Sequence, residues 1–309
     1  MAPQALTKTR ISRSTWRELF EGYLFAAPFI IGFFLFTAYP MGYALWLAFQ
    51  KWDLISPPQF IGLTNFIKMF SDERAMLSLY NSAYYTIIAV PFQLIIFFSL
   101  ALALTQNIKG RDIYRAGFYL PIIVPLIAGA VVWQRAFNPE YGIFNEILGW
   151  FGLNNPAKPL QWLFDVNLAK PAFIIMSFLS IGRQMVIFIA GLGNIPQSLI
   201  EASSIDGAGP ITRLFNITIP MMTPLIFYNM VIAIVNSFQS FIPALIMIDN
   251  PGVGPENSIL FAVLNIYREG FQFFNLGYAS ALSWELFVII IGFTIAQFYG
   301  SQRWVYYED

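Results

Sequence analysis

Six long apolar runs dominate the hydrophobic pattern of the chain. Four runs contain no charged residue, and two contain one each, Arg183 in the fourth and Glu285 in the sixth. A bilayer core about 30 Å thick needs about 20 helical residues, and each run reaches about that length. Runs this continuous exclude the alternating strands of a membrane β-barrel. The pattern predicts six membrane-spanning helices, over residues 24–49, 84–104, 116–134, 171–192, 221–248 and 281–300.

The composition supports a membrane location and limits the chemistry. Of 309 residues, 57% are hydrophobic and 11% are charged, whereas a soluble globular chain is about one quarter charged. Cysteine and histidine are both absent, which excludes disulfides, thiolate catalysis, Ser-His triads and metal sites ligated by either residue. The net charge is zero and no basic run indicates nucleic-acid binding. We therefore expect a multi-pass membrane protein that is not an enzyme and binds no metal.

The N-terminal segment is basic, but the apolar run after it is far longer than the core of a cleaved signal peptide. We expect residues 1–20 to form a cytoplasmic tail, disordered to residue 15, and 21–309 to form a single membrane domain whose external loops hold short interfacial helices. Lys and Arg residues favour the cytoplasmic side. With both termini inside, the cytoplasmic segments hold nine of them, against seven in the longer external segments. The nine are Lys8, Arg10, Arg13, Arg17, Lys109, Arg111, Arg115, Arg213 and Arg303.

The predicted cytoplasmic connection 193–220, between the fourth and fifth helices, carries helix start signals. Pro196 suits a first helical turn. The spacing Ser198-x-x-Glu201 fits a capping box, in which each side chain bonds the backbone N–H of the other residue. A short helix is therefore predicted here, outside the membrane.

The same connection carries stop signals. Gly207 supplies the left-handed backbone position at which helices end. Pro210 then opens a second short helix, and Pro220 is expected to end it before the membrane. Such a helix–turn–helix offers a partner protein a compact surface to bind. Its exposed apolar face is expected to comprise Leu199, Ala202 and Ile205.

This connection resembles the coupling-loop signature of the permease subunits of ATP-binding-cassette importers. The residues that match are Glu201, Ala202, Asp206, Gly207 and Ala208, and the match continues to Ile217 and Pro220. Ser203 stands where alanine is commonest in the family, a small-for-small change. Other segments resemble the carbohydrate-uptake branch, and within it the first permease of maltose or glycerol-phosphate systems. They are 23–28 (YLFAAP), 39–40 (YP), 138–142 (NPEYG), 276–281 (LGYASA) and 303–308 (RWVYYE).

The resemblance implies an all-α helix bundle of the type I importer permease fold in a bacterial or archaeal cell membrane. It also implies three partners: a second homologous permease, a dimer of nucleotide-binding ATPase subunits, and an extracytoplasmic solute-binding protein. The chain contains no G-x-x-x-x-G-K-[ST] phosphate loop. ATP and Mg²⁺ are therefore expected on the partner subunits, and this chain is expected to bind no cofactor. The five matching residues are expected to contact the ATPase.

Polar residues inside the predicted spans suggest a substrate path. On the fourth helix, Ser180, Arg183 and Gln184 share a face, because they lie three and four residues apart. Asn229, Asn236, Ser237 and Ser240 share a face of the fifth. For Asn229, Ser237 and Ser240, lining a cavity and holding helices together by hydrogen bonds are equally good interpretations. Arg183 favours a cavity or a partner, because a cation in lipid is costly.

Several alternatives remain at this point. Glu285 either pairs with Arg183 or lies at the outer headgroups, and the second is preferred. A mono-, di- or oligosaccharide is the preferred substrate, with a glycerol phosphodiester as the alternative. A self-sufficient ion-coupled transporter would need an acid in the membrane, and Glu285 is the one acid in the predicted spans. An intramembrane enzyme would need clustered acids, which do not occur.

Overall fold

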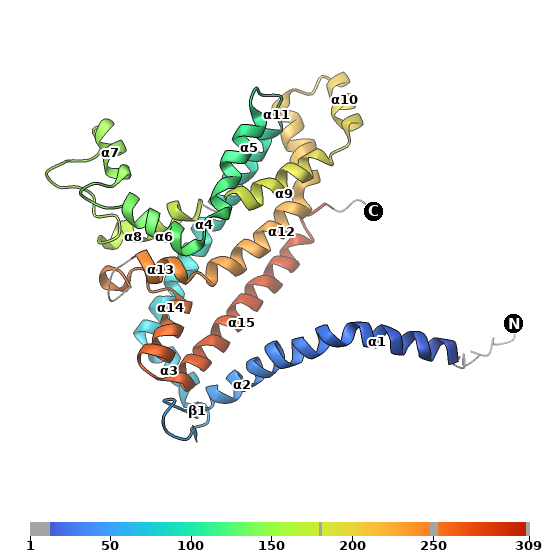
Figure 1. The fold of residues 1–309 in the computed structure, drawn as a ribbon. Coiled ribbons are helices and arrows are strands. Elements are labelled where there is room, and N and C mark those ends of the chain that lie inside the picture. The colour runs from blue at the N-terminus through green and yellow to red at the C-terminus, as the bar shows by residue number, and fades with distance from the viewer. Residues whose placement is uncertain (1–12, 179–180, 248–252, 307–309) are drawn as a thin grey trace.

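The structure, a computed structural model, describes residues 13–178, 181–247 and 253–306 (Figure 1). In this part of the chain the elements are almost all helices, which confirms the predicted all-α class. The α-helices are α1 (Arg13–Phe33), α2 (Tyr39–Ala48), α3 (Thr64–Ser71), α4 (Glu73–Thr105), α5 (Arg111–Tyr119), α6 (Leu126–Ala136), α7 (Ile143–Trp150), α8 (Val166–Ser177), α9 (Ile181–Gly193), α10 (Gln197–Ile205), α11 (Pro210–Arg213), α12 (Ile219–Phe238), α13 (Ile242–Met247), α14 (Ala262–Tyr267) and α15 (Leu276–Ser301).

Shorter elements join or extend these helices. Three π-helical turns continue α1, α11 and α14, namely η1 (Phe34–Ala38), η4 (Leu214–Thr218) and η6 (Arg268–Gln272). Two 3₁₀ turns are η2 (Leu120–Ile123) and η5 (Pro255–Asn257). Strands β1 (Gln50–Lys51) and β2 (Gln59–Phe60) form an antiparallel hairpin in which Gln50 pairs with Phe60. The connections between the predicted spans also hold the short helices α3, α7 and α14, and their external, interfacial position stays a prediction.

Four helices of the described chain are long and apolar enough to cross a membrane. They are Trp16–Ala48, Glu73–Thr105, Pro210–Phe238 and Leu276–Ser301. Two bent pairs pass the same test together, Arg111–Ile123 with Leu126–Ala136 and Val166–Ser177 with Gly182–Gly193. The number of spans is therefore four, or six when each bent pair crosses once. Six spans stay a prediction.

The third predicted span, 116–134, is not one straight helix. Its two halves meet at 104° between Ile123 and Leu126. The cause is Pro125, whose ring disfavours helical geometry at the preceding residue, and Val124 accordingly has an extended ψ of 124°. The fourth span also departs from the prediction, because α8 and the start of α9 differ in direction by 48°.

The fifth predicted span, 221–248, is interrupted as well. Helix α12 ends at Phe238 and α13 begins at Ile242. Proline at 243 has no backbone N–H, so it cannot continue the hydrogen bonding of α12 to the carbonyl of Gln239. The prediction of one helix through this region is therefore wrong. Residue 248 lies outside the described residues.

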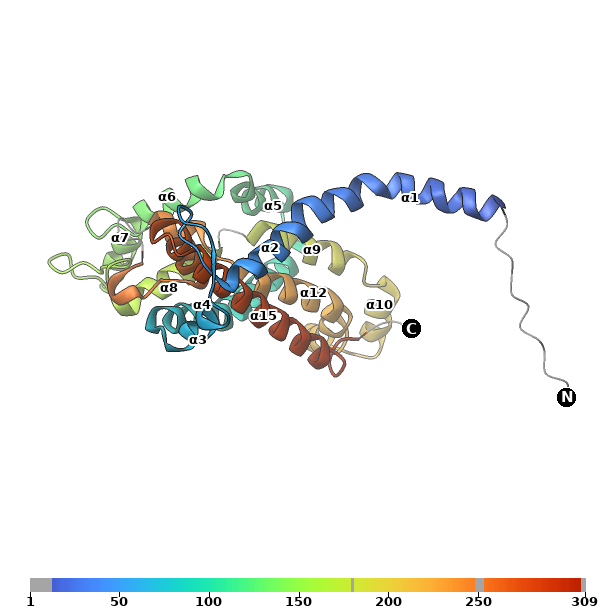
Figure 2. The same cartoon turned by 90° about the horizontal axis from the view of Figure 1, so that it is seen from below.

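Helix α1 behaves differently from the rest of the molecule. Figures 1 and 2 show it running away from the bundle, which it joins only through α2, packed against α15. The chain is helical from Arg13, so disorder is wrong for residues 13–15, and 1–12 lie outside the described part. The i,i+4 ion pair between Arg17 and Glu21, 2.8 Å long, supports this early start. Phe25 is 87% exposed.

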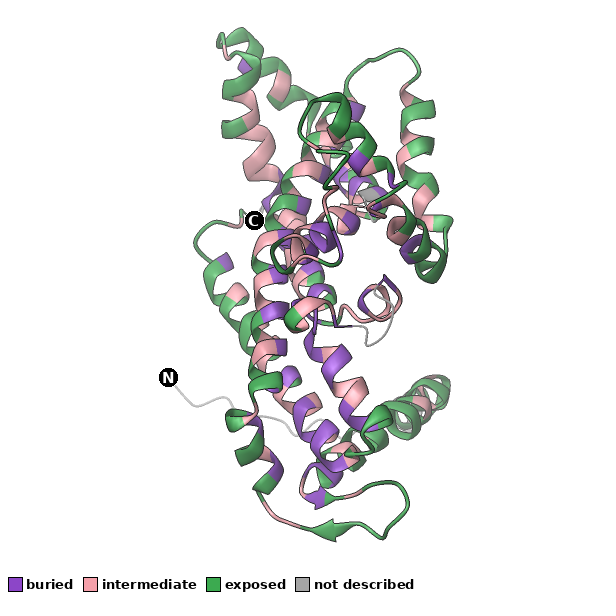
Figure 3. Ribbon diagram, turned by 90° about the vertical axis from the view of Figure 1, so that its left-hand side faces the viewer, coloured by how far each residue is buried: buried purple, intermediate pink, exposed green. Residues whose placement is uncertain are grey.

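The body of the molecule is built around α4. This helix packs against α9 and α12, and the buried positions gather where these helices face one another (Figure 3). Polar side chains on α4 fix the neighbouring chain. Asn81 Nδ2 donates to the carbonyls of Asn257 and Leu260 at 2.9 and 3.1 Å, and Ser82 Oγ accepts from the backbone N–H of Ala262 at 2.9 Å. These bonds hold the segment before α14 against the bundle.

Candidate functional site

A cavity of about 1040 Å³ lies among the helices, and eight α-helices contribute to its wall: α4, α6, α8, α9, α12, α13, α14 and α15. We call it the central cavity. Its polar lining comes from α4, α8, α9, the end of α12, the connection from α12 to α13, and α15. The lining residues used below are Gln93, Arg183, Gln184, Asn236, Ser237, Gln239, Ser240 and Ser283.

The helix breaks described above all occur at this cavity. Residues 121–126 at the bend between α5 and α6 line it, as do 239–243 between α12 and α13. The first turn of α9 contributes Arg183 and Gln184. Irregular backbone at membrane depth is tolerated where it lines a polar cavity or is buried in protein. The breaks that sequence reasoning missed therefore form the wall of the site.

Gly182 sets the position of the first turn of α9. A Cβ atom on it would lie 2.6 Å from the carbonyl oxygen of Phe118 and 2.9 Å from Cα of Tyr119. Both are backbone atoms on α5, so they have little freedom to move. Glycine is therefore required for this close approach, and it brings Arg183 next to the bend at 121–126.

The residues predicted for the substrate path fall into two groups in the structure, those that line the central cavity and those that do not. Four of them, Arg183, Gln184, Asn236 and Ser240, line the central cavity, and Asn236 and Arg183 are exposed to it. Ser237 lines the cavity and also joins helices, because its Oγ lies 2.8 Å from Oγ1 of Thr86 on α4.

Asn229, which is also predicted for the substrate path, does not line the cavity. Asn229 is 3% exposed, and its Nδ2 donates to the carbonyl of Leu225 on the same helix at 2.8 Å. Ser180 lies outside the described residues. Glu285 is half-buried on α15 and, in the described part of the chain, forms no ion pair with Arg183. The possible pairing of these two residues is therefore not seen.

Sequence reasoning missed the polar stripe on α4. Asn81, Ser82, Thr86 and Gln93 recur at helical spacing and are each at least 92% buried. The helical spacing of these polar residues within an apolar run was the signal from which the stripe could have been predicted. Gln93 is the member that reaches the central cavity.

The predicted helix–turn–helix is present at the end of the molecule where α10 and α11 meet (Figure 1). We call residues 193–213 the coupling hairpin. Pro196 is the N-cap of α10 rather than its first helical residue, and no side chain caps that end. The capping box of Ser198 and Glu201 is therefore wrong. Pro220 also fails to end the second helix, because Pro210–Phe238 is one continuous helix.

The turn after α10 is a Schellman motif, in which a left-handed residue closes a helix with two hydrogen bonds. The N–H of Ala208 donates to the carbonyl of Ser203 at 2.9 Å, and the N–H of Gly207 donates to that of Ser204 at 3.2 Å. Gly207 has φ +77°, as predicted. Asp206 is the C-cap. The signature residues Asp206-Gly207-Ala208 therefore encode one rigid helix end.

A side-chain contact braces the coupling hairpin. Arg213 Nη1 donates to Ser204 Oγ at 3.1 Å, which ties α11 to α10. Glu201, Ala202 and Asp206 are exposed, as is Ile205, at 87%. The hairpin thus presents two carboxylates and an apolar side chain on a rigid body.

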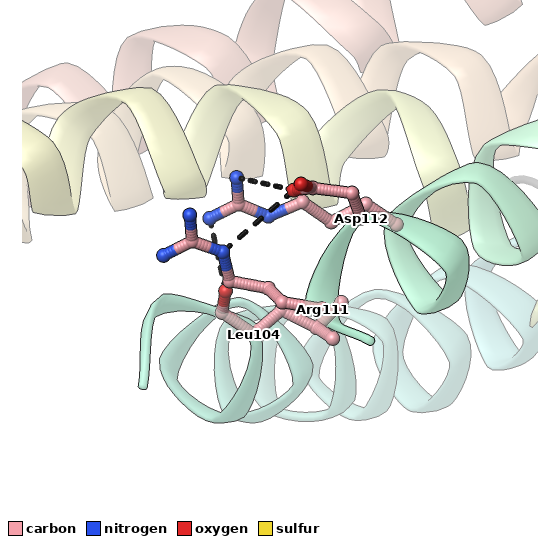
Figure 4. A network of polar contacts seen from close by, with 4 residues as sticks. Leu104, Arg111 and Asp112 are labelled. Atoms are coloured by element: carbon pink, nitrogen blue, oxygen red, sulfur yellow. Dashed lines mark hydrogen bonds and ion pairs between the residues drawn. The ribbon is translucent and has the colours of Figure 1, made fainter. Parts of the chain in front are cut away.

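The connection between α4 and α5 lies at the same end of the molecule (Figure 1), and a network of polar contacts holds it (Figure 4). Arg115 on α5 donates from Nη2 to the carbonyl of Leu104 at 2.9 Å, and its Nη1 lies 3.8 Å from Asp112. Arg111 lies 3.7 Å from Asp112. These contacts close the turn between α4 and α5, where Gly110 has φ +76°.

Comparison with known proteins decides the family. The family model described as "Binding-protein-dependent transport system inner membrane component" matches residues 79–304. The chain belongs to this family. The match confirms the resemblance to permease subunits and the membrane setting.

Individual relatives agree with the family. The probable ABC transporter permease protein YesP of Bacillus subtilis is 39% identical over 300 residues, covering 96% of each chain. The sn-glycerol-3-phosphate transport system permease protein UgpA of Yersinia enterocolitica is 32% identical over 292 residues, covering 93% of this chain and 95% of that one.

A solved structure shares the fold. A chain from the crystal structure of a bacterial ABC transporter involved in import of the acidic polysaccharide alginate superimposes with a TM-score of 0.79 at 22% identity, covering 94% of this chain and 99% of that one. The same transporter in complex with an alginate pentasaccharide-bound periplasmic protein gives a TM-score of 0.80 at 21% identity, covering 93% and 97%.

Proposed function

We propose that this chain is a membrane subunit of an ATP-driven importer and forms, with a second permease, the path for a carbohydrate. A mono-, di- or oligosaccharide is handed over by an extracytoplasmic binding protein. The observation that carries the proposal is the continuous helix Pro210–Phe238, which begins in the coupling hairpin and ends at the central cavity. At 1.5 Å per residue, this helix is about 43 Å long.

The coupling hairpin is the proposed contact with the ATPase. Its rigid turn presents the exposed carboxylates of Glu201 and Asp206 and the exposed side chain of Ile205 together, which offers a partner two charges and one apolar contact. Helix α9 leads from Arg183 in the cavity to the hairpin, and α11–α12 leads back. Movement of the hairpin as a rigid body would therefore move two walls of the cavity. ATP and Mg²⁺ reside on the separate ATPase subunits.

Helix α1 supports the second permease as a partner. It runs apart from its own bundle, and Phe25, Phe29 and Phe36 are each more than three quarters exposed, at 87%, 78% and 82%. A helix placed in this way is positioned to pack against a neighbouring membrane subunit. The proposed orientation places both termini and the coupling hairpin in the cytoplasm, in agreement with the charge distribution.

The names of the relatives support a carbohydrate-like substrate. One relative acts in sn-glycerol-3-phosphate transport, and one structural neighbour acts in alginate import. A glycerol phosphodiester stays the alternative substrate. The wall of the central cavity carries amide, hydroxyl and guanidinium groups, which suit a hydroxylated solute.

Affinity purification of the chain from its native membrane, followed by mass spectrometry, tests the proposed partners. Recovery of a second permease and an ATPase with a phosphate loop is expected. Purification as a homodimer that moves solute without ATP would instead support the ion-coupled alternative, and Glu285 would then be the residue to mutate.

A double substitution tests the coupling role. Glu201→Ala with Asp206→Ala removes two exposed carboxylates that have no hydrogen-bond partner in the described chain. We expect normal insertion and assembly of the chain, with loss of ATP-dependent uptake. Full uptake by this variant would contradict the assignment of the hairpin.

A further inference from the structure

The central cavity has an unbalanced charge. Of the described residues that line it, Arg183 is the one charged side chain, and no aspartate or glutamate accompanies it. Glu285 lies on α15 between the lining residues Ser283 and Leu286 but does not itself line the cavity. A cation in a membrane protein is normally paired with an acid or with backbone carbonyls. Arg183 has neither in the described part of the chain.

The backbone adds to the positive potential. Helix α6 begins at Leu126 on the cavity wall, and no side chain caps its first turn. Helix α9 begins at Ile181, so Arg183 lies in its first turn. The first backbone N–H groups of a helix lack partners within the helix, and that end carries partial positive charge. The uncapped first turn of α6 therefore adds to the positive potential that Arg183 brings to the cavity.

A buried amide also lacks a partner at this cavity. Gln93 is 8% exposed and lines the cavity, and its side chain forms no hydrogen bond within the described residues. Gln184 Oε1, on the neighbouring helix α9, is buried and has no hydrogen-bond partner in the described part of the chain. Buried polar atoms in proteins are nearly always hydrogen-bonded. The two amides therefore point to a ligand that supplies hydroxyl groups.

We infer that the central cavity recognises an anionic carbohydrate, with Arg183 as the counter-ion of its carboxylate or phosphate group. This inference rests on the proposed importer function and specifies its substrate class. Gln93 and Gln184 hydrogen-bond to sugar hydroxyls, and the first turn of α6 faces the same anionic group. A cavity of about 1040 Å³ accommodates a disaccharide or a larger fragment. Carboxylate and phosphate share this recognition chemistry.

The test uses the complete transporter, with its partner permease, ATPase and binding protein, reconstituted in liposomes. Uptake of four labelled probes is compared: digalacturonate, its neutral dimethyl ester, sn-glycerol 3-phosphate and maltose. Arg183→Gln removes the positive charge. Arg183→Lys keeps the positive charge but lacks the planar guanidinium group that can form two parallel hydrogen bonds to an anion. Arg303→Gln is the matched control, because its exposed side chain follows α15, more than about 20 Å along the helix from Leu286.

We expect ATP-dependent uptake of an anionic probe at least tenfold faster than that of the neutral probes. The carboxylate and phosphate probes distinguish the two anions. Arg183→Gln should lower this uptake at least tenfold, Arg183→Lys should restore part of it, and Arg303→Gln should leave it unchanged. Equal ATP-dependent uptake of the dimethyl ester or maltose, unaffected by Arg183→Gln, would overturn the anionic assignment and leave the importer function standing. Uptake that does not require ATP would overturn the importer function itself.

Discussion

The coupling hairpin and the central cavity are built in opposite ways. Every hydrogen bond that shapes the hairpin joins residues at most nine positions apart, the longest being that between Ser204 and Arg213. The cavity wall, by contrast, brings together residues from Tyr85 to Leu286. The hairpin is therefore a locally encoded rigid body, whereas the cavity depends on how eight helices pack. Mutations should consequently separate the proposed coupling to the ATPase from the proposed recognition of substrate, because few mutations affect both the hairpin and the cavity.

The substitution with the largest expected effect disrupts the central cavity and leaves the coupling hairpin unchanged. Gly182→Val places side-chain atoms against backbone of α5, where a Cβ alone would lie 2.6 Å from the carbonyl of Phe118. Overpacking of this kind costs about 1–3 kcal/mol. We expect a lower melting temperature of the purified complex and more than tenfold slower uptake. Gly193→Ala, at the open end of the same helix, should change neither quantity.

The converse substitution distorts the turn of the coupling hairpin and leaves the central cavity unchanged. Gly207→Val forces a β-branched residue into φ +77°, at a cost of about 1–2 kcal/mol. Uptake should fall about tenfold, while binding of a probe to the cavity should be unchanged. Gly209→Ala is the matched control, because Gly209 has φ −70° and space around it. Loss of uptake in that control would show that any change in the turn is harmful, and would contradict the argument from φ.

Two asparagines on α12 sharpen the distinction between structure and recognition. Asn229→Ala removes a side-chain hydrogen bond to the backbone of Leu225 on the same helix and should lower stability by about 1 kcal/mol without changing probe affinity. Asn236→Ala should weaken probe binding several-fold and leave stability unchanged, because Asn236 is exposed to the cavity. Thermal unfolding and equilibrium binding on the same preparations measure both quantities. The reverse pattern would contradict the placement of these residues.

The smallest expected effect concerns the capping box that did not form. Ser198 is exposed and caps no backbone N–H of α10. Ser198→Ala should therefore change stability by no more than about 0.5 kcal/mol and should leave uptake unchanged. A decrease above about 1 kcal/mol would indicate that Ser198 caps the helix in the assembled transporter.

Prediction from sequence succeeded where the physical cause is local. The left-handed backbone at Gly207 follows from the signature Asp206-Gly207-Ala208, because a Schellman turn needs a residue without a Cβ at that position. Leu199, Ala202 and Ile205 lie on one short helix at a spacing of three residues, and all three are exposed. Prediction failed at Pro125 and Pro243, which break their spans, because prolines in membrane helices are often accommodated by neighbouring groups.

The sequence by itself determined the class of the protein, the approximate spans and the rigid turn of the coupling hairpin. The reason is that the apolar length of a membrane-spanning helix and the backbone geometry of a turn each depend on a short stretch of sequence. Only the tertiary structure separated Asn236, which lines the cavity, from Asn229, which bonds its own helix. It alone placed Gln93 of α4 in the cavity with Arg183 of α9, ninety residues away. Helical spacing shows which residues share a face, but the packing of other helices decides whether that face meets protein, lipid or a cavity.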